Sequence, residues 1–143
     1  MGFGDLFRRK SKPPRAEVRV IGMPFVMSDD GRFFADPGGR VGDVFLAAGA
    51  ESVIAAGRMI AVQGKPVHLT NESFAYKPSL AQMTRLVARL DTMGVDLSGD
   101  GQGVIVIVYE RVSADGIGIG DGARYRVVKK DSGIELVRET SAN

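Results

Sequence analysis

The sequence predicts an α+β fold in which a largely antiparallel sheet of short strands is packed by one amphipathic helix, at about residues 79–93. Short apolar or alternating runs are separated by glycine-containing turn signals, which is typical of β-hairpins. One segment instead repeats its apolar residues at intervals of three and four, which indicates a helix. Strands are predicted on both sides of that helix, and this order favours an α+β architecture.

The strands predicted before the helix are short and end at turn signals. Asp29-Asp30-Gly31 is a hairpin turn signal, 36–42 is predicted to be a loop, and 63–66 is predicted to turn between two longer runs. Alanine and glycine weaken the strand propensity of the longest run without breaking its apolar character. The predicted strands of this half are 17–21, 24–28, 32–35, 53–62 and 67–71.

The helix carries local signals at both of its ends. Ser79 and Gln82 stand three residues apart and form a capping box, in which each side chain satisfies a free amide of the first turn. Gly94 follows the last periodic residue, where glycine adopts the left-handed conformation at low cost. The residues expected on the buried face are Leu80, Met83, Leu86, Val87, Leu90 and Met93.

Strands return after the helix. The run 104–112 has the highest β-propensity in the chain and is predicted to be a central strand, and 124–128 with 134–138 is predicted to form a hairpin. Between them, glycine occupies every second position from Gly116 to Gly122. A dinucleotide-binding fingerprint needs a helix after its glycines. A strand follows here, so we expect a flexible hairpin loop.

The chain divides into a basic leader with a proline-rich connection, 1–15, and one α+β domain, 16–143. The first 20 residues hold six basic and two acidic groups, whereas the remaining residues hold 13 basic and 15 acidic groups. A mildly acidic body makes a broad nucleic-acid surface improbable. The leader is either a frayed terminus or a segment that contacts another protein or an anionic membrane through Phe3, Leu6, Phe7, Arg8, Arg9 and Lys10.

Composition excludes several classes of site. The chain has no cysteine and one histidine, which excludes disulfide scaffolds, thiol nucleophiles and multi-histidine metal centres. We expect no cofactor and no metal, and we interpret Asp29, Asp30, Asp115 and Asp121 as solvated turn carboxylates. No cleaved signal or membrane-spanning run is apparent, so we expect a cytoplasmic location or export by a route without a cleaved signal. The stretch 96–101 matches a short Asp-x-Ser-x-x-Gly pattern of cyclic-dinucleotide barrels, but its distance from any arginine motif disfavours that interpretation.

Three stretches together resemble a known domain: PFVMSDDGRFFAD, then AESVIAAGRMIAVQGKPVHLTNESFAYKPS, and GVDLS after the helix. This pattern, from Pro24 to Ser98, resembles C-terminal modules of bacterial polymorphic toxins and a segment of calmodulin-binding IQ-motif proteins. In those relatives an apolar Val-x-Ala-Ala-Gly strand precedes a Ser-Gly-His-Tyr-x-Pro element and an amphipathic helix. The positions that match these two elements are Val53, Ala55, Ala56, Gly57, Asn71, Ser73, Tyr76 and Pro78.

The departures from this pattern bear on activity. Phe74-Ala75 stands where the relatives carry Gly-His, and Val44-Phe45-Leu46 stands approximately where they carry His-Ser-Ser. Apolar side chains cannot transfer protons. The resemblance therefore implies a non-catalytic version of the domain, with its scaffold positions retained.

Three functions remain open at this point. The first is a non-catalytic binding or adaptor module of bacterial type, with a ligand-binding segment at Ser73, Tyr76 and Lys77 near the helix N-terminus. The second is a toxin-like effector enzyme acting on a nucleotide or a nucleotide-containing substrate, for which Tyr76, Lys77, His68 and Glu72 are the candidate catalytic residues. The third is a structural component of a phage or secretion assembly. A packing role for Tyr76 and a structural or surface role for His68 are the alternatives at those two positions.

Overall fold

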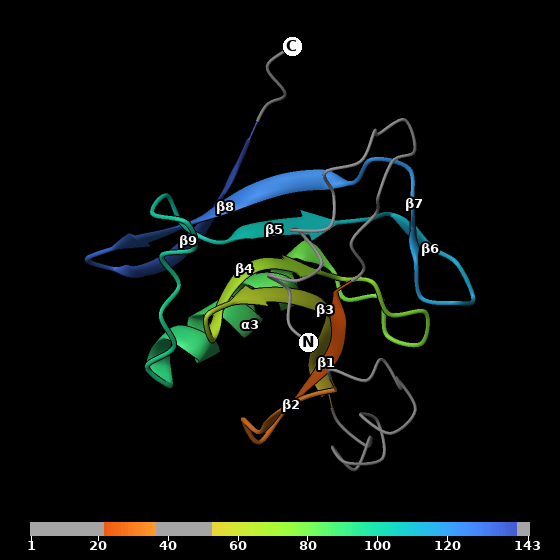
Figure 1. Cartoon of the computed structure of the whole chain (residues 1–143), viewed down its shortest axis with the longest axis horizontal. Helices are drawn as coiled ribbons and strands as arrows, with labels where there is room; N and C mark the ends of the chain where they lie inside the picture. The colour runs from red at the N-terminus through yellow and green to blue at the C-terminus, as the bar shows by residue number, and fades with distance from the viewer. Residues whose placement is uncertain (1–21, 37–52, 140–143) are drawn as a thin grey trace.

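The computed structural model describes residues 22–36 and 53–139, and within them seven strands form one large sheet beside a single α-helix. The strand order is β2-β1-β3-β4-β5-β8-β9, and a separate two-stranded ribbon pairs β6 with β7 (Figure 1). The strands of the large sheet are β1 (Met23–Ser28), β2 (Phe33–Ala35), β3 (Val53–Val62), β4 (Lys65–Thr70), β5 (Ile105–Val108), β8 (Ala123–Lys130) and β9 (Gly133–Arg138).

The predicted mixed fold, with a mostly antiparallel sheet of short strands and one helix, is confirmed in this part of the chain. Among the described strands only β4 and β5 pair in parallel. A parallel pair needs a long crossover connection. The helix α3 (Leu80–Thr92) lies within that connection. The helix therefore joins the hairpins of the first half to those of the second.

Both ends of α3 follow the local signals. The Ser79 hydroxyl accepts a hydrogen bond from the Gln82 amide at 3.2 Å, and the Gln82 side chain accepts one from the Ser79 amide at 2.9 Å. This is the predicted capping box. Gly94, just beyond the helix, has a φ of 87°, so the predicted left-handed glycine is also present.

The turn between β3 and β4 is tighter than predicted. Gln63 and Gly64 have φ angles of 53° and 79°, which form a two-residue turn, and β4 already begins at Lys65. Pro66 therefore lies inside the strand and not in the turn. It pairs with Ala61 next to a shift in register, a position that tolerates the missing N–H of proline.

The predicted strand 104–112 is divided in two, and this part of the prediction is wrong. β5 ends at Val108, and β6 (Arg111–Val112) belongs to the small ribbon with β7 (Gly118–Ile119). Between them, the Tyr109 N–H donates to Asn71 Oδ1 at 2.8 Å, and the Tyr109 carbonyl accepts from Asn71 Nδ2 at 2.9 Å. Asn71 thus takes the place of a neighbouring strand as the partner of both backbone groups of Tyr109. As predicted, β5 itself is central, with neighbours on both sides.

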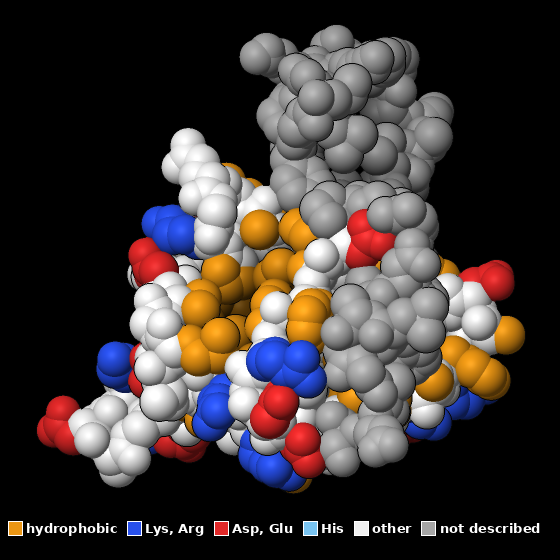
Figure 2. Space-filling view, turned by 90° about the horizontal axis from the view of Figure 1, so that it is seen from below, with side chains coloured by type: hydrophobic (Ala, Val, Ile, Leu, Met, Phe, Trp, Pro, Cys, Tyr) orange, Lys and Arg blue, Asp and Glu red, His pale blue; other side chains and the backbone are white. Residues whose placement is uncertain are grey.

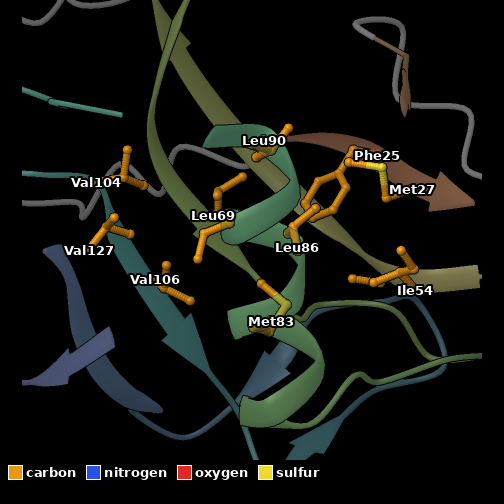
Figure 3. Packing of buried hydrophobic residues seen from close by; sticks show 12 residues of the cluster. Phe25, Met27, Ile54, Leu69, Met83, Leu86, Leu90, Val104, Val106 and Val127 are labelled. Atoms are coloured by element: carbon orange, nitrogen blue, oxygen red, sulfur yellow. The ribbon is translucent and has the colours of Figure 1, made fainter. Parts of the chain in front are cut away.

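One hydrophobic cluster contains buried side chains from the helix and from the sheet. Met83, Leu86 and Leu90 of α3 point toward side chains of β1, β3 and β4 (Figure 3). Val104 and Val106 alternate with Ile105 and so face the same side as Leu69 of β4. The buried members of the cluster are Phe25, Met27, Ile54, Ala55, Leu69, Met83, Leu86, Val87, Leu90, Val104, Val106 and Val127.

Charges of both signs lie interspersed on the face of the described residues shown in Figure 2, where hydrophobic side chains gather around a hollow. In the part of the chain that the structure describes, no helix is long and apolar enough to cross a membrane. The predicted strand 17–21, most of the loop 36–42, the leader and Val44-Phe45-Leu46 lie outside the described residues.

We predict that Leu86→Ala lowers the free energy of unfolding by about 2–5 kcal/mol, because Leu86 is fully buried in the main cluster and its truncation leaves a cavity. Urea denaturation followed by circular dichroism measures this loss. The matched control is Arg85→Ala, one position away on the exposed face of α3, which should change stability by less than about 0.5 kcal/mol. Equal midpoints for the two variants would contradict the assignment of this face to the core.

Candidate functional site

The segment between β4 and α3 carries most of the candidate residues, and Asn71 holds it in place. The Asn71 side chain is buried, and its Nδ2 donates to the carbonyls of Pro78 and Tyr109, each at 2.9 Å. Its Oδ1 accepts from the Tyr109 amide at 2.8 Å. One amide group thus joins the start of the segment, its end before the helix, and the end of β5. The sequence marks Asn71 only as a matched position of the resemblance.

Ser73, Tyr76 and Lys77 lie together in one turn of this segment. The Ser73 hydroxyl accepts from the Tyr76 amide at 3.2 Å, and the Ser73 carbonyl accepts from the Lys77 amide at 2.8 Å. Ser73 is buried, and Tyr76 packs against a second small cluster formed by Val26 and Ala56. Of the three predicted ligand-binding residues, Lys77 is the exposed one.

Lys77 has a φ of 34°, in the left-handed region that non-glycine residues rarely occupy. The next residue, Pro78, is buried and disfavours a helical conformation at Lys77. Strain of this kind persists only where the surroundings fix the backbone. The bond from Asn71 to the Pro78 carbonyl and the helix cap at Ser79 supply that constraint.

The Glu72 carboxylate connects this segment to the small ribbon. Its Oε1 accepts from the Thr70 hydroxyl at 2.9 Å, and its Oε2 accepts from the Gly118 amide at 2.7 Å. Both oxygens therefore hold β7 against the end of β4. This arrangement positions two elements, and each carboxylate oxygen accepts one hydrogen bond from the surrounding structure.

Arg58 is a functional group that the sequence analysis did not select. It is buried on β3, where its Nε donates to the Gly116 carbonyl and its Nη1 donates to the Gly22 carbonyl, each at 3.1 Å. The sequence signal for this role is a charged residue inside the apolar run 53–62. A guanidinium buried in a sheet needs fixed hydrogen-bond acceptors, so such a residue is expected to hold other segments of the backbone. Arg58 thus ties the start of β1 and the glycine-rich segment to the middle of the sheet.

The glycine-rich segment 116–122 is partly a strand, and its glycines permit close contact with an aromatic ring. A Cβ built on Gly118 would lie 2.4 Å from ring atoms of Tyr109, and one on Gly122 would lie 3.1 Å from the same ring. The bonds from Arg58 and Glu72 hold two points of this segment. Two residues of the expected loop therefore form strand β7, and the segment contacts Arg58, Glu72 and Tyr109.

His68 lies on β4, two residues before Thr70, whose hydroxyl donates to Glu72. Since Leu69 faces the main core, its neighbour His68 points to the other face of the sheet, in the register row of Ile105 and Arg126. Burial lowers the pKa of His68 below its ordinary value of 6.5, Arg124 lowers the pKa further, and Asp100 raises it. Among the described residues no hydrogen bond joins His68 to Glu72, Tyr76 or Lys77.

Among the candidate turn carboxylates, Asp30 is hydrogen-bonded to its own neighbours in the chain. Asp30 accepts from the Ser28 hydroxyl and from Arg32 Nε, and these bonds hold the pKa of its carboxyl below the ordinary value. Within 22–36 and 53–139, no three His, Asp or Glu side chains gather in a way that could hold a metal ion.

No family model, curated protein or solved structure matches this chain.

We predict that Gly118→Ala lowers the free energy of unfolding by about 1–3 kcal/mol, because the new methyl group would overlap the Tyr109 ring. In a Tyr109→Ala background, the same change should cost less than about 0.5 kcal/mol. A double-mutant cycle by urea denaturation measures the difference. Equal costs in both backgrounds would show that the ring is not what requires glycine at this position.

We predict that His68 makes the fold less stable as the pH falls below about 6.5. The unfolded chain binds a proton at His68 near pH 6.5, whereas the folded chain binds it only at the lower folded pKa. The contribution of neutral His68 to stability is therefore fully present above the pKa of the unfolded chain. It declines as the pH falls from that value to the lower pKa of the folded chain. His68→Gln should flatten the dependence of the urea midpoint between about pH 7.5 and 5.5. If the urea midpoint of this variant depends on pH as strongly as that of the wild type, the proposed role of His68 is refuted.

Proposed function

We propose that the chain is a non-catalytic binding or adaptor module of bacterial type that contacts a protein partner in the cytoplasm. The observation that carries this proposal is the exposure of a hydrogen-bonded segment, residues 73–77, which we call the presented loop. Asn71 fixes the loop from inside the fold, while Phe74 at its tip is 62% exposed. An exposed aromatic ring on a fixed backbone suits recognition, because little conformational entropy is lost when it is covered.

The chemistry of the presented loop indicates the kind of partner. Phe74 offers a large apolar side chain, Lys77 adds a positive charge, and Leu80 at the start of α3 is 37% exposed. No carboxylate among the described residues forms an ion pair with Lys77. We therefore propose a partner surface with an apolar pocket and acidic groups at its margin.

The polar groups near the loop support a structural role over a catalytic one. The hydrogen bonds of Glu72, Asn71 and Arg58 within the described chain go to backbone groups and to a hydroxyl. Covalent catalysis by an activated side chain needs a nucleophile and a base within hydrogen-bond reach of each other. Within the described residues no hydrogen bond joins His68 to another candidate catalytic residue, which favours the binding module over the toxin-like enzyme.

The proposed relationship to the polymorphic toxin modules is consistent with the roles of the matched positions. A Cβ on Gly57 would lie 1.8 Å from the Thr70 carbonyl, so this position needs glycine for the close approach of β3 and β4. The Asn71 side chain donates a hydrogen bond to the Pro78 carbonyl. The matched positions are thus scaffold positions, and we propose that α3 covers the sheet as that scaffold requires.

The basic leader is proposed as a second contact, to the same partner or to an anionic surface. Its aromatic and basic residues offer apolar area and charge together. Two weak contacts on one chain raise the overall affinity through a high effective concentration.

The test is a quantitative pull-down from lysate of a bacterial host, comparing wild type with Phe74→Ser and Lys77→Glu. We predict that each variant loses most of any specifically captured protein, at least about fivefold, because an interface centre carries most of the affinity. The matched control is Val62→Ser, since Val62 is 42% exposed at the β3–β4 turn, away from the presented loop. A version lacking residues 1–12 measures the contribution of the leader.

Two results would contradict this function. The first is capture that falls equally in Val62→Ser and in the two loop variants, which would indicate general adhesion. The second is turnover of NAD or another nucleotide by the purified chain, or toxicity in a bacterial host that His68→Ala and Tyr76→Phe abolish, which would establish the enzyme.

A further inference from the structure

A cavity of about 490 Å³ lies at the opposite end of α3 from the presented loop, between the segment 95–103 and strand β8. Its floor is apolar and belongs to the edge of the main core. Val127 is a buried member of that core, and Val95, Leu97 and Ile134 pack against it. The volume lies within the range of about 300–1,000 Å³ that is usual for sites of single small molecules.

The wall formed by 95–103 is held by its own hydrogen bonds and by the sheet. The Gly103 amide donates to the Ser98 carbonyl at 2.8 Å, and Arg126 Nη1 donates to the Gly103 carbonyl at 3.2 Å. A Cβ on Gly103 would lie 2.3 Å from the Val127 carbonyl, so the chain passes close against β8. The cavity is therefore formed before any ligand enters, which lowers the entropic cost of binding.

The charged residues that line this cavity are two carboxylates and one lysine, and each carboxylate forms an exposed or half-exposed pair with a lysine. Asp91 and Asp96 line the cavity, and Lys129 is the one basic residue among its lining residues. Lys129 Nζ lies 3.1 Å from Asp91 Oδ1, but the lysine side chain is 71% exposed, and such pairs are weak. The last turn of α3 also ends here, and the C-terminus of a helix favours cations.

Asp96 is held as a carboxylate and oriented by its neighbour. Its Oδ1 accepts from the Ser98 hydroxyl at 2.7 Å and from the Ser98 amide at 3.0 Å, and these bonds lower the pKa of Asp96. Its Oδ2 lies 3.6 Å from Lys65 Nζ in a half-exposed pair. A ligand cation competes with that lysine at little cost. The stretch 96–101 thus contributes a fixed anionic group to the cavity.

We propose that this cavity binds a small organic cation with an apolar body, of the arylalkylammonium class. The apolar floor would cover the ring, and the ammonium group would lie between Asp91 and Asp96 at the rim. A free small molecule fits this single, half-enclosed cavity better than an extended peptide, which needs a groove that continues beyond it. The proposal goes beyond the partner-binding function, since a helix of 13 residues, about 20 Å long, separates the two sites.

The experiment is a titration of the full chain with tyramine, followed by backbone amide NMR, with 4-hydroxyphenylacetate as the charge-reversed probe. A probe of this size binds in the millimolar range, so the titration extends to about 20 mM. We expect saturable shifts at the amides of 95–103 and 127–129 with tyramine, and none with the carboxylate. The amides of the presented loop should not move, which separates this test from the test of partner binding.

The variants Asp91→Asn and Asp96→Asn keep the shape of the rim and remove one charge each. Each should weaken tyramine binding about two- to fivefold, the range for a half-exposed ion pair. The matched control Asp131→Asn removes a carboxylate at the β8–β9 turn, outside the cavity, and should leave binding unchanged. Well-dispersed amide spectra for all three variants verify that they fold.

The proposal is overturned if both probes shift the same amides equally, since the rim would then not select a cation. It is also overturned if the shifts do not saturate, if they map away from 95–103 and 127–129, or if Asp131→Asn weakens binding as much as Asp96→Asn.

Discussion

The buried amide of Asn71 is the interaction on which the arrangement of the other elements depends. It bonds to both backbone groups of Tyr109 and to the carbonyl of Pro78. These contacts end β5, fix the entry into α3, and hold the segment between them. These hydrogen bonds stabilise the fold only when all of them form, because each buried group left without a partner would lower the free energy of unfolding by about 1–3 kcal/mol. The geometry of the whole segment is therefore determined at one residue.

Two further polar groups extend this arrangement to the small ribbon. Arg58 bonds to the carbonyls of Gly116 and Gly22, and Glu72 bonds to the amide of Gly118. Each connects segments far apart in the sequence through backbone atoms. Such contacts constrain position without requiring a particular side chain on the ribbon, which explains how a run of glycines can be held in a defined shape.

The sequence predicts features that depend on neighbouring residues and misses those that depend on distant ones. The capping box of Ser79 with Gln82 and the left-handed Gly94 are local, and both are confirmed. The division of 104–112 depends on Asn71, more than 30 residues away, and no periodicity within the strand reveals it. Among the candidate site residues, the sequence places Ser73, Tyr76 and Lys77 in one segment, but not the burial of Ser73 or the exposure of Phe74. The cavity beside 95–103 arises from tertiary packing alone, and the only sequence signal for the role of Arg58 is its charge inside the apolar run 53–62.

The parallel pair of β4 and β5 affects how the protein unfolds locally. Only three residue pairs, from His68 with Ile105 to Thr70 with Ile107, form the ladder between two antiparallel halves of the sheet. Each half is made of hairpins that close over short turns, so each can keep its own hydrogen bonds when the ladder breaks. The helix contacts β3 in one half and β9 in the other, and it therefore opposes this separation. In hydrogen exchange, the amides of the ladder would mark the boundary between two cooperative units. The unfolding of these units is coupled by α3 and by the hydrogen bonds of Asn71, Arg58 and Glu72.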